Sequence, residues 1–189
     1  MNKFETALKK YLSIFQDQER YFVNDVRNLE LFAGIPQNLT EEDIRTKVSA
    51  INDSDLRHLY IQDAMIEHIH KLNIDECLHR NDLSLVEDIA TITVNGKAHQ
   101  VLHFASVYCN YHKPEVYPIY SEQFHAFYKQ YILEKNLPLD SEKLTTYSVF
   151  SEALNHLNRH LGVNEKMNYL QQRKFAWLYA ESILKESTT

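Results

Sequence analysis

The stretch YHKPEVYPIYSEQF, residues 111–124, places two prolines and three tyrosines between two segments whose apolar residues recur at helical spacing. Pro114 disfavours helical geometry at Lys113 and so ends the first helix. Pro118 keeps the chain extended until Ser121 can cap the second helix. A plain connector would use Gly, Ser or Asn instead of large rings. We therefore predict a stiff corner between two helices, with side chains that line a recess.

The two helices that flank this corner are rich in aromatic residues. Residues 104–131 contain nine of the 22 aromatic residues of the chain. We interpret most of these rings as core packing, and the alternative is a stacking surface for bases or other planar ligands. The rings that recur at helical spacing are Phe104, Tyr108 and Tyr111 in the first helix and Phe124, Phe127, Tyr128 and Tyr131 in the second.

Helical periodicity extends over most of the chain, which only three glycines and four prolines interrupt. The exception is an alternating segment around Asn95-Gly96, a pair that favours a two-residue hairpin turn. The predicted fold class is therefore all-α, a compact single-domain helical bundle over residues 1–189 with one short β-hairpin near residues 90–101. The expected helices cover residues 4–32, as one long helix or two short ones, and residues 40–51, 53–72, 82–89, 99–111, 121–134, 145–161 and 164–185.

Composition limits the classes of function. The formal net charge of −6 argues against a protein that grips nucleic acid with its whole surface, because phosphate neutralisation needs clustered Lys and Arg. The longest apolar run, residues 175–180, is far shorter than the roughly 20 residues that a membrane span needs. Cys77 and Cys109 are too few for a disulfide framework. We expect a cytoplasmic protein without membrane contact; nothing in the sequence indicates its oligomeric state.

The corner also carries a family resemblance. HFASVYCNYHKPEVYPIYSEQF, residues 103–124, resembles a motif of bacterial all-helical proteins that reads F-A-[ST]-K-Y-C-x-x-H-x-P-x-x-Y-P-I-Y-D. RKFAWLYAESIL, residues 173–184, is similar to the terminal helix of the same proteins. These proteins look like distant members of the helix-hairpin-helix DNA glycosylase superfamily, which contains the 8-oxoguanine DNA glycosylases. The resemblance implies their helical fold and a glycosylase-like site at the corner.

The departures from that motif fall on its reactive positions. Val107 stands where the resembled proteins carry a Lys, which in bifunctional members attacks the sugar. Ser121 stands where they carry an Asp, which stabilises an electron-poor sugar. Glu122 follows directly and is a weak catalytic candidate, since one residue along a helix turns a side chain by about 100°. A G-x-G hairpin of the kind that binds phosphate backbone is also missing. We expect a protein without glycosylase chemistry.

The candidate site follows from the corner and from scattered basic residues. We predict that a nucleotide or nucleic acid binds in the recess beside the corner. A small patch of basic side chains near the C-terminus could face phosphate, and a scatter over the surface is the alternative. The predicted ligand-binding residues are Tyr111, Tyr120, Ser121, Glu122 and His125, the predicted nucleic-acid contacts are Lys113, Arg159 and Lys166, and the patch adds Arg173 and Lys174.

Two other classes of function stay open. The acidic chain fits a protein-interaction module without enzymatic activity. A metal-dependent enzyme is the second alternative, because a Glu and a His three residues apart share a helical face; Cys109 reads as a small buried hydrophobe. We expect no cofactor and no bound metal. The pairs are Glu67 and His70, Glu76 and His79, and Glu122 and His125, and a two-histidine face combines His156 and His160 with Glu152.

Overall fold

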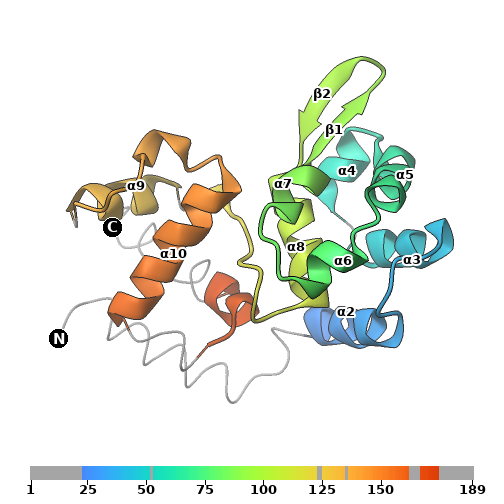
Figure 1. The fold of residues 1–189 in the computed structure, drawn as a ribbon, viewed down its shortest axis with the longest axis horizontal. Helices are drawn as coiled ribbons and strands as arrows, with labels where there is room; N and C mark the ends of the chain where they lie inside the picture. Colours follow the sequence, from blue (N-terminus) through green and yellow to red (C-terminus); the bar gives the residue numbers. More distant parts are fainter. Residues whose placement is uncertain (1–22, 52, 123–124, 135, 162–166, 175–189) are drawn as a thin grey trace, which may run out of the picture.

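The computed structural model describes residues 23–51, 53–122, 125–134, 136–161 and 167–174. This part of the chain is mainly helical and carries one antiparallel two-stranded hairpin, so the predicted all-α class with one short β-hairpin is confirmed (Figure 1). The elements, in chain order, are α2 (Val23–Gly34), α3 (Glu41–Ile51), α4 (Ser54–His58), α5 (Gln62–Leu72), α6 (Asp75–His79), α7 (Leu85–Ala90), β1 (Thr91–Val94), β2 (Lys97–Gln100), α8 (Leu102–His112), α9 (His125–Glu134), the 3-10 helix η3 (Ser141–Lys143), α10 (Tyr147–Leu161) and a helical turn over 169–174.

Helix α8 is the centre of the packing. Helices α2, α3 and α7 contact it, and α5 packs against α3 and α7. Helices α9 and α10 contact each other and η3, and form a second group on the other side of an extended segment, residues 113–120, which we call the corner segment (Figure 1). Nine of the eleven residues of α8 are buried. A helix that is buried nearly all round has no solvent face, which is why α8 lacks clear amphipathic spacing.

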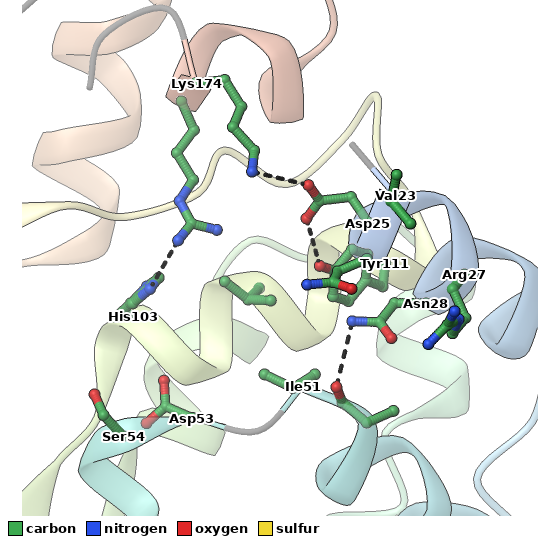
Figure 2. Close-up of a pocket in the computed structure, with 14 residues that line it drawn as sticks. Val23, Asp25, Arg27, Asn28, Ile51, Asp53, Ser54, His103, Tyr111 and Lys174 are labelled. Atoms are coloured by element: carbon green, nitrogen blue, oxygen red, sulfur yellow. Dashed lines mark hydrogen bonds and ion pairs between the residues drawn. The ribbon is translucent and has the colours of Figure 1, made fainter. Parts of the chain in front are cut away.

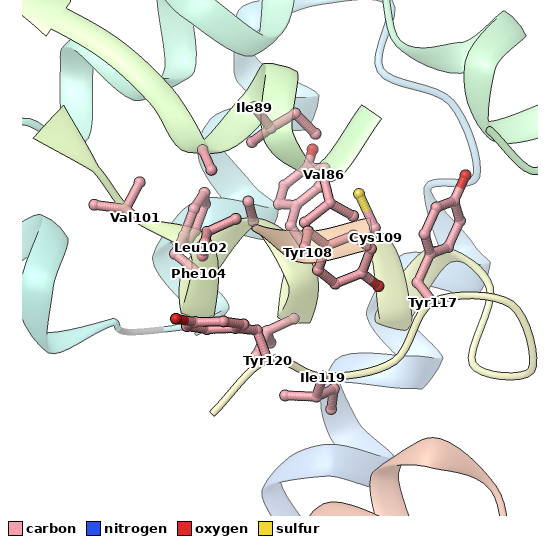
Figure 3. Packing of buried hydrophobic residues seen from close by; sticks show 14 of the residues in the cluster. Val86, Ile89, Val101, Leu102, Phe104, Tyr108, Cys109, Tyr117, Ile119 and Tyr120 are labelled. Atoms are coloured by element: carbon pink, nitrogen blue, oxygen red, sulfur yellow. The ribbon is translucent and has the colours of Figure 1, made fainter. Parts of the chain in front are cut away.

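The aromatic residues of α8 and the corner segment form core, as the sequence predicts. Tyr108 and Tyr117 are 0% exposed and Tyr120 is 3% exposed. Figure 3 shows these rings with Cys109, and with Val86 and Ile89 of α7. Burial raises the pKa of the Cys109 thiol well above its usual value, so the group stays protonated and acts as a small apolar side chain.

Two polar side chains of α8 hold the corner segment. The Ser106 hydroxyl accepts a hydrogen bond of 2.9 Å from the backbone N–H of Tyr120. The Asn110 amide donates to the carbonyl oxygens of Tyr117 at 2.7 Å and Pro114 at 3.3 Å. Ser106 and Asn110 are themselves 0% exposed. Within the segment, the N–H groups of Val116 and Tyr117 donate to the Lys113 carbonyl in a turn. Ser106 and Asn110 provide hydrogen bonds that the buried backbone of residues 117–120 needs in addition.

The second helix group is attached to the first through Tyr147. Its hydroxyl donates to the carbonyl of Pro118 at 2.8 Å, and its backbone N–H donates to Glu87 Oε1 at 2.7 Å. Glu87 lies on α7, so a carboxylate from the first group binds the amino terminus of α10. Free N–H groups and the helix dipole both favour a negative charge at that position.

A buried lysine joins α3 to the chain before it. Lys47 is 0% exposed, and its ammonium donates to the carbonyl of Gln37 at 2.7 Å and to Asn38 Oδ1 at 2.9 Å. The Tyr108 hydroxyl donates to the same Asn38 oxygen at 2.6 Å, and the Asn38 amide donates to Asp75 Oδ1 at 2.6 Å. Burial lowers the pKa of Lys47 to about 8. The network therefore fixes α3, α6 and α8 at the cost of burying a cation.

The hairpin was predicted correctly, and its turn explains the register. Asn95 and Gly96 both have positive φ, 53° and 74°, as a two-residue type I′ turn requires. Strand β2 continues to Gln100, so α8 begins at Leu102 and the expected start at His99 is wrong. Helix α9 begins at His125, four residues later than the predicted start at Ser121.

The single helix predicted over residues 53–72 is wrong, because the chain forms α4 and α5 with a break at Tyr60. Tyr60 has φ 54°, and Ile61 N–H donates to the carbonyl of Leu56 at 3.1 Å while Tyr60 N–H donates to that of Arg57 at 3.2 Å. This is a Schellman ending, in which Gly is the usual left-handed residue. Leu56 and Ile61 are both 2% exposed and supply the apolar contact that accompanies the motif.

Other sequence-based expectations fall partly or wholly outside the described residues. The helix expected over residues 4–32 is described from residue 23 onward, and it ends at Gly34 as predicted. Of the helix expected over 164–185, residues 167–174 are described; residues 169–174 are helical, and residues 167–168 are not.

We predict that Asn110→Ala lowers the free energy of unfolding by about 2–3 kcal/mol, because the carbonyl oxygen of Tyr117 loses its buried donor. Chemical denaturation monitored by circular dichroism measures the change. Asn24→Ala, at an exposed position of α2, is the matched control and should change stability by less than about 0.5 kcal/mol. Equal effects of the two substitutions would contradict the role given to Asn110.

A second prediction concerns His112, whose ring packs against Phe32 and Tyr108 with centroid distances of 4.9 and 5.4 Å. Burial, with the nearby Lys47 cation, lowers its pKa from 6.5 to about 3. Below pH 6.5 the imidazole of His112 binds a proton in the unfolded chain but stays neutral in the folded chain. The free energy of unfolding therefore falls as the pH falls from 6.5 towards 3. His112→Phe should remove up to about 1.4 kcal/mol per pH unit from that slope.

The free energy of unfolding of the parent and the variant is measured at several pH values between pH 7 and pH 4. The slope of this free energy against pH, and not its absolute value, is compared. His58→Phe, at an exposed histidine, is the control and should keep the parent slope. A His112→Phe slope equal to that of the parent would show that this ring is not the acid-sensitive group.

Candidate functional site

A large cavity lies between α2, the α3–α4 junction, α8 and the 169–174 helix (Figure 2). Its volume is about 650 Å³, within the range of small-molecule sites. Polar and charged side chains dominate its wall, with a few apolar ones between them. The lining residues are Val23, Asn24, Asp25, Arg27, Asn28, Ala50, Ile51, Asp53, Ser54, His103, Val107, Tyr111, Arg173 and Lys174.

Helix α8 supplies one wall through residues four apart. His103, Val107 and Tyr111 recur at this spacing, which places them on one face of the helix. Tyr111 is 6% exposed, and its ring packs against Phe32 at a centroid distance of 5.4 Å. The ring is therefore fixed by core packing, while its hydroxyl reaches the cavity wall.

A buried carboxylate from α2 stands opposite this face. Asp25 is 6% exposed; its Oδ1 accepts a hydrogen bond of 2.8 Å from the Tyr111 hydroxyl, and its Oδ2 lies 3.1 Å from Lys174 Nζ (Figure 2). Burial and the neighbouring Asp25 charge raise the pKa of Tyr111, so the phenol stays neutral and donates. The three residues come from three separate segments and tie α2, α8 and the 169–174 helix together.

The 169–174 helix is positioned by its own amino terminus. Asn168 Oδ1 accepts from the N–H of Gln171 at 2.9 Å, and Gln171 Oε1 accepts from the N–H of Asn168 at 3.0 Å, a reciprocal capping box. The Asn158 amide of α10 donates to Gln172 Oε1 at 2.7 Å. These contacts fix the direction in which the next two side chains, Arg173 and Lys174, leave the helix.

Arg173 forms the part of the cavity wall next to α8. Its Nη2 lies 3.4 Å from His103 Nε2. Arg173 also lines a second, much smaller space of about 20 Å³, which Ser121 and Tyr169 share. That volume holds about one water molecule. Arg173 is thus the residue that the larger cavity and the corner have in common.

The structure separates the residues that the sequence predicts as one recess. Tyr111 lines the large cavity, whereas Ser121 lines the small space. Tyr120 is 3% exposed and packs edge-on against Phe150 at 5.1 Å and against His125 at 5.3 Å. Burial lowers the pKa of His125, in agreement with its place in this aromatic cluster. These side chains support the second helix group and do not line the large cavity.

The remaining predicted residues lie apart from the large cavity. Glu122 is exposed. The Lys113 ammonium donates to Asn81 Oδ1 at 2.6 Å and to the carbonyl of His79 at 3.3 Å, so it ties the corner segment to the end of α6. Arg159 is exposed on α10, and Lys166 lies outside the described residues. No basic track through these three positions is described.

Sequence reasoning missed Asp25, Asn28 and His103. Asp25 and Asn28 sit in an ordinary helical pattern, and Asp25 is 86 residues from its partner Tyr111. The sequence feature that could have identified Asp25 and Asn28 is their place on the same helical face as the apolar Phe32, with which they are buried. That signal identifies an inward polar group but not its partner.

The Glu and His pairs do not assemble into a metal centre within the described part of the chain, where no three His, Cys, Asp or Glu side chains gather at ligand distances. Glu67 pairs with Lys71, and Glu76 pairs with Arg80 at 3.1 Å. Glu76 and His79 both lie in helix α6. The side chain of His160 lies outside the description.

Among the described helices, none combines the length and the apolar character that a membrane crossing requires.

Comparison with known proteins finds two relationships. A family model named HI_0787_N and described as an N-terminal domain matches residues 7–116. A curated relative from Haemophilus influenzae, named uncharacterized protein, is 26% identical over 118 residues, which cover 61% of this chain and 54% of that protein. The chain thus spans about half the length of that relative. No solved structure matches the chain.

We predict that Asp25→Ala lowers the free energy of unfolding by about 1–3 kcal/mol, because the buried Tyr111 hydroxyl loses its acceptor. Asp63→Ala is the control: Asp63 is 85% exposed and makes one surface ion pair with Arg45, a contact worth about 1 kcal/mol or less. Thermal and denaturant unfolding measure both. A loss for Asp25→Ala no larger than for Asp63→Ala would contradict the central place of Asp25.

Proposed function

The chain belongs to the HI_0787_N N-terminal domain family, and we propose that it is a DNA glycosylase-like protein that lacks base-excision chemistry and binds a nucleotide unit, free or within nucleic acid. The site of binding is the large cavity between α2, α8 and the 169–174 helix. The observation that carries the proposal is the place of Val107, the position at which the resembled glycosylases carry their reactive Lys.

Val107 lies in the wall of the large cavity and is 4% exposed. A Lys at this position would direct its amine towards whatever the cavity holds, which is the arrangement that a sugar-attacking nucleophile needs. Valine keeps an apolar surface against which a planar ring can pack but has no nucleophile. The position thus supports a retained binding site together with lost chemistry.

The polar groups of the cavity suit a nucleotide. Carboxylate and amide side chains of α2, Asp25 and Asn28, can hydrogen-bond the edges of a base or the hydroxyls of a sugar. Arg173 offers a planar guanidinium, a group that matches phosphate geometry. The mainly polar wall suits a ligand that is itself polar, as the sugar and the phosphate of a nucleotide are.

The residues at the positions that would assist base excision, Ser121 and Glu122, support the loss of that chemistry. Ser121 replaces the Asp of the resembled motif and lines the small space, where a neutral hydroxyl cannot offset positive charge on a sugar. Glu122 is exposed and is not among the residues that line the large cavity. The weak catalytic candidate of the sequence therefore has no supporting geometry.

The test is a ligand panel combined with an excision assay. Nucleoside monophosphates should raise the thermal midpoint of the full chain, since a ligand at 100 times its Kd adds about 2.7 kcal/mol of stability. A duplex oligonucleotide that contains 8-oxoguanine should release no base. Val107→Phe should fill the cavity and abolish the thermal shift, whereas Val26→Phe, at an exposed position of α2 outside the cavity, should keep it.

Two results would overturn the proposal. One is base release by the purified chain above the background of a catalytically inert control protein. The other is the absence of any thermal shift or calorimetric signal with every nucleobase, nucleoside and nucleotide of the panel and with single- and double-stranded DNA.

A further inference from the structure

The charges of the large cavity are unevenly paired. Its wall contains the basic residues Arg27, Arg173 and Lys174 and the acidic residues Asp25 and Asp53. Lys174 is engaged by Asp25, with its Nζ 3.1 Å from Oδ2. Arg173 has no carboxylate within ion-pair distance among the described residues; its polar contact there is His103 Nε2 at 3.4 Å. No ion pair of Arg27 is found among the described residues either, so the wall presents two guanidiniums that the described carboxylates do not pair. Arg27 is exposed, whereas Arg173 is the half-buried one and lies beside α8.

Arg173 is placed to receive an anion. It is half-buried, and the capping box at Asn168 fixes the helix from which it projects. A guanidinium that is partly withdrawn from water attracts an anion more strongly than one on an open surface, because the effective dielectric is lower. Its fork of N–H donors fits two oxygens of a phosphate at once.

The rest of the wall suits the uncharged part of such a ligand. Val107 and Ile51 offer apolar surface, and Asp25 on the opposite side offers a carboxylate acceptor. A volume of about 650 Å³ accommodates a base, a sugar and one phosphate within the usual range of ligand sites.

The same residues disfavour a polymer. A nucleic acid strand needs clustered Lys and Arg along its backbone, and each neutralised phosphate adds to affinity. Here the chain carries a formal net charge of −6, and Asp25 and Asp53 line the cavity itself. Lys113 is held by Asn81 Oδ1 at 2.6 Å, on the α6 side of the corner segment.

We propose, on the basis of the proposed function, that the ligand of the large cavity is a free nucleoside monophosphate whose phosphate is bound by Arg173 and whose base and sugar lie between Val107 and Asp25. The phosphate supplies the charge that Arg173 lacks among the described residues. The carboxylates of Asp25 and Asp53 in the wall disfavour a strand of nucleic acid, whose phosphates repeat along its length.

Isothermal titration calorimetry on the full chain tests this with four probes: the common nucleoside monophosphates, the corresponding nucleosides, inorganic phosphate, and a 5′-phosphorylated single-stranded oligonucleotide. A charge-assisted phosphate contact should make one monophosphate bind about 10- to 100-fold more tightly than its nucleoside. Arg173→Gln should remove that preference and leave nucleoside affinity within about 3-fold, a margin set by ordinary context dependence.

The matched control is Arg159→Gln, at an exposed arginine of α10 that does not line the cavity, and it should keep the monophosphate preference. Arg173→Lys should retain part of it, because the charge stays and the fork is lost. Thermal unfolding of each variant without ligand checks that the fold is intact, and nucleoside binding by the Arg173 variants does so independently.

The outcomes separate this inference from the proposed function. Equal affinity for nucleoside and monophosphate overturns the role of Arg173 and leaves nucleotide binding in place. Binding of the oligonucleotide at least as tight as that of the monophosphate, weakened by Arg159→Gln, overturns the free ligand in favour of nucleic acid. Binding of none of the four probes overturns both.

Discussion

The structure depends on how α8 holds an extended chain. Ser106 and Asn110 are polar residues in the most buried helix, and each hydrogen-bonds backbone groups of the corner segment. Without these bonds the buried residues 117–120 would leave backbone carbonyl and amide groups without partners, which costs about 1–3 kcal/mol for each group. The prolines make the segment stiff, and α8 determines where it runs. The path of the segment also determines where the second helix group lies, because the Tyr147 hydroxyl donates a hydrogen bond to the carbonyl of Pro118.

The site follows from the same helix. One face of α8 carries Ser106 and Asn110 to the corner segment, and another carries Val107 and Tyr111 to the large cavity. Asp25 and Lys174 complete the cavity from segments far apart in the chain. The cavity wall thus combines a core residue whose position is fixed by packing with charged residues that solvent can still reach. Such an arrangement keeps the polar groups in place before a ligand arrives, which reduces the cost of binding.

The fold was predictable where the chain uses common chemistry. Asn95-Gly96 predicted the hairpin, and Pro114 predicted the end of α8, because each of these residues favours a narrow range of backbone conformations. The break at Tyr60 was not predictable by the same rule, since a large aromatic residue takes a left-handed position that glycine usually occupies. The buried pair of Leu56 and Ile61 stabilises that ending, and such a pair is visible only once the core is known.

The candidate site was predictable only in part. Tyr111 was identified through the corner, and Arg173 and Lys174 were noted as basic residues. Their partner Asp25 was not, because a spacing of 86 residues leaves no local pattern. Tyr120 and His125 were placed in the recess on the strength of their proximity in sequence. Tertiary packing instead places the Tyr120 ring against Phe150 and the His125 ring against Tyr120.

The large cavity crosses the end of the family match. Its α2 and α8 walls belong to residues 7–116, whereas Arg173 and Lys174 come from beyond that boundary. The α2 and α8 walls therefore lie within the matched domain, and the wall formed by Arg173 and Lys174 lies outside it. A substitution at Arg173 or Lys174 therefore changes the wall of the large cavity and leaves every residue of the family match unaltered.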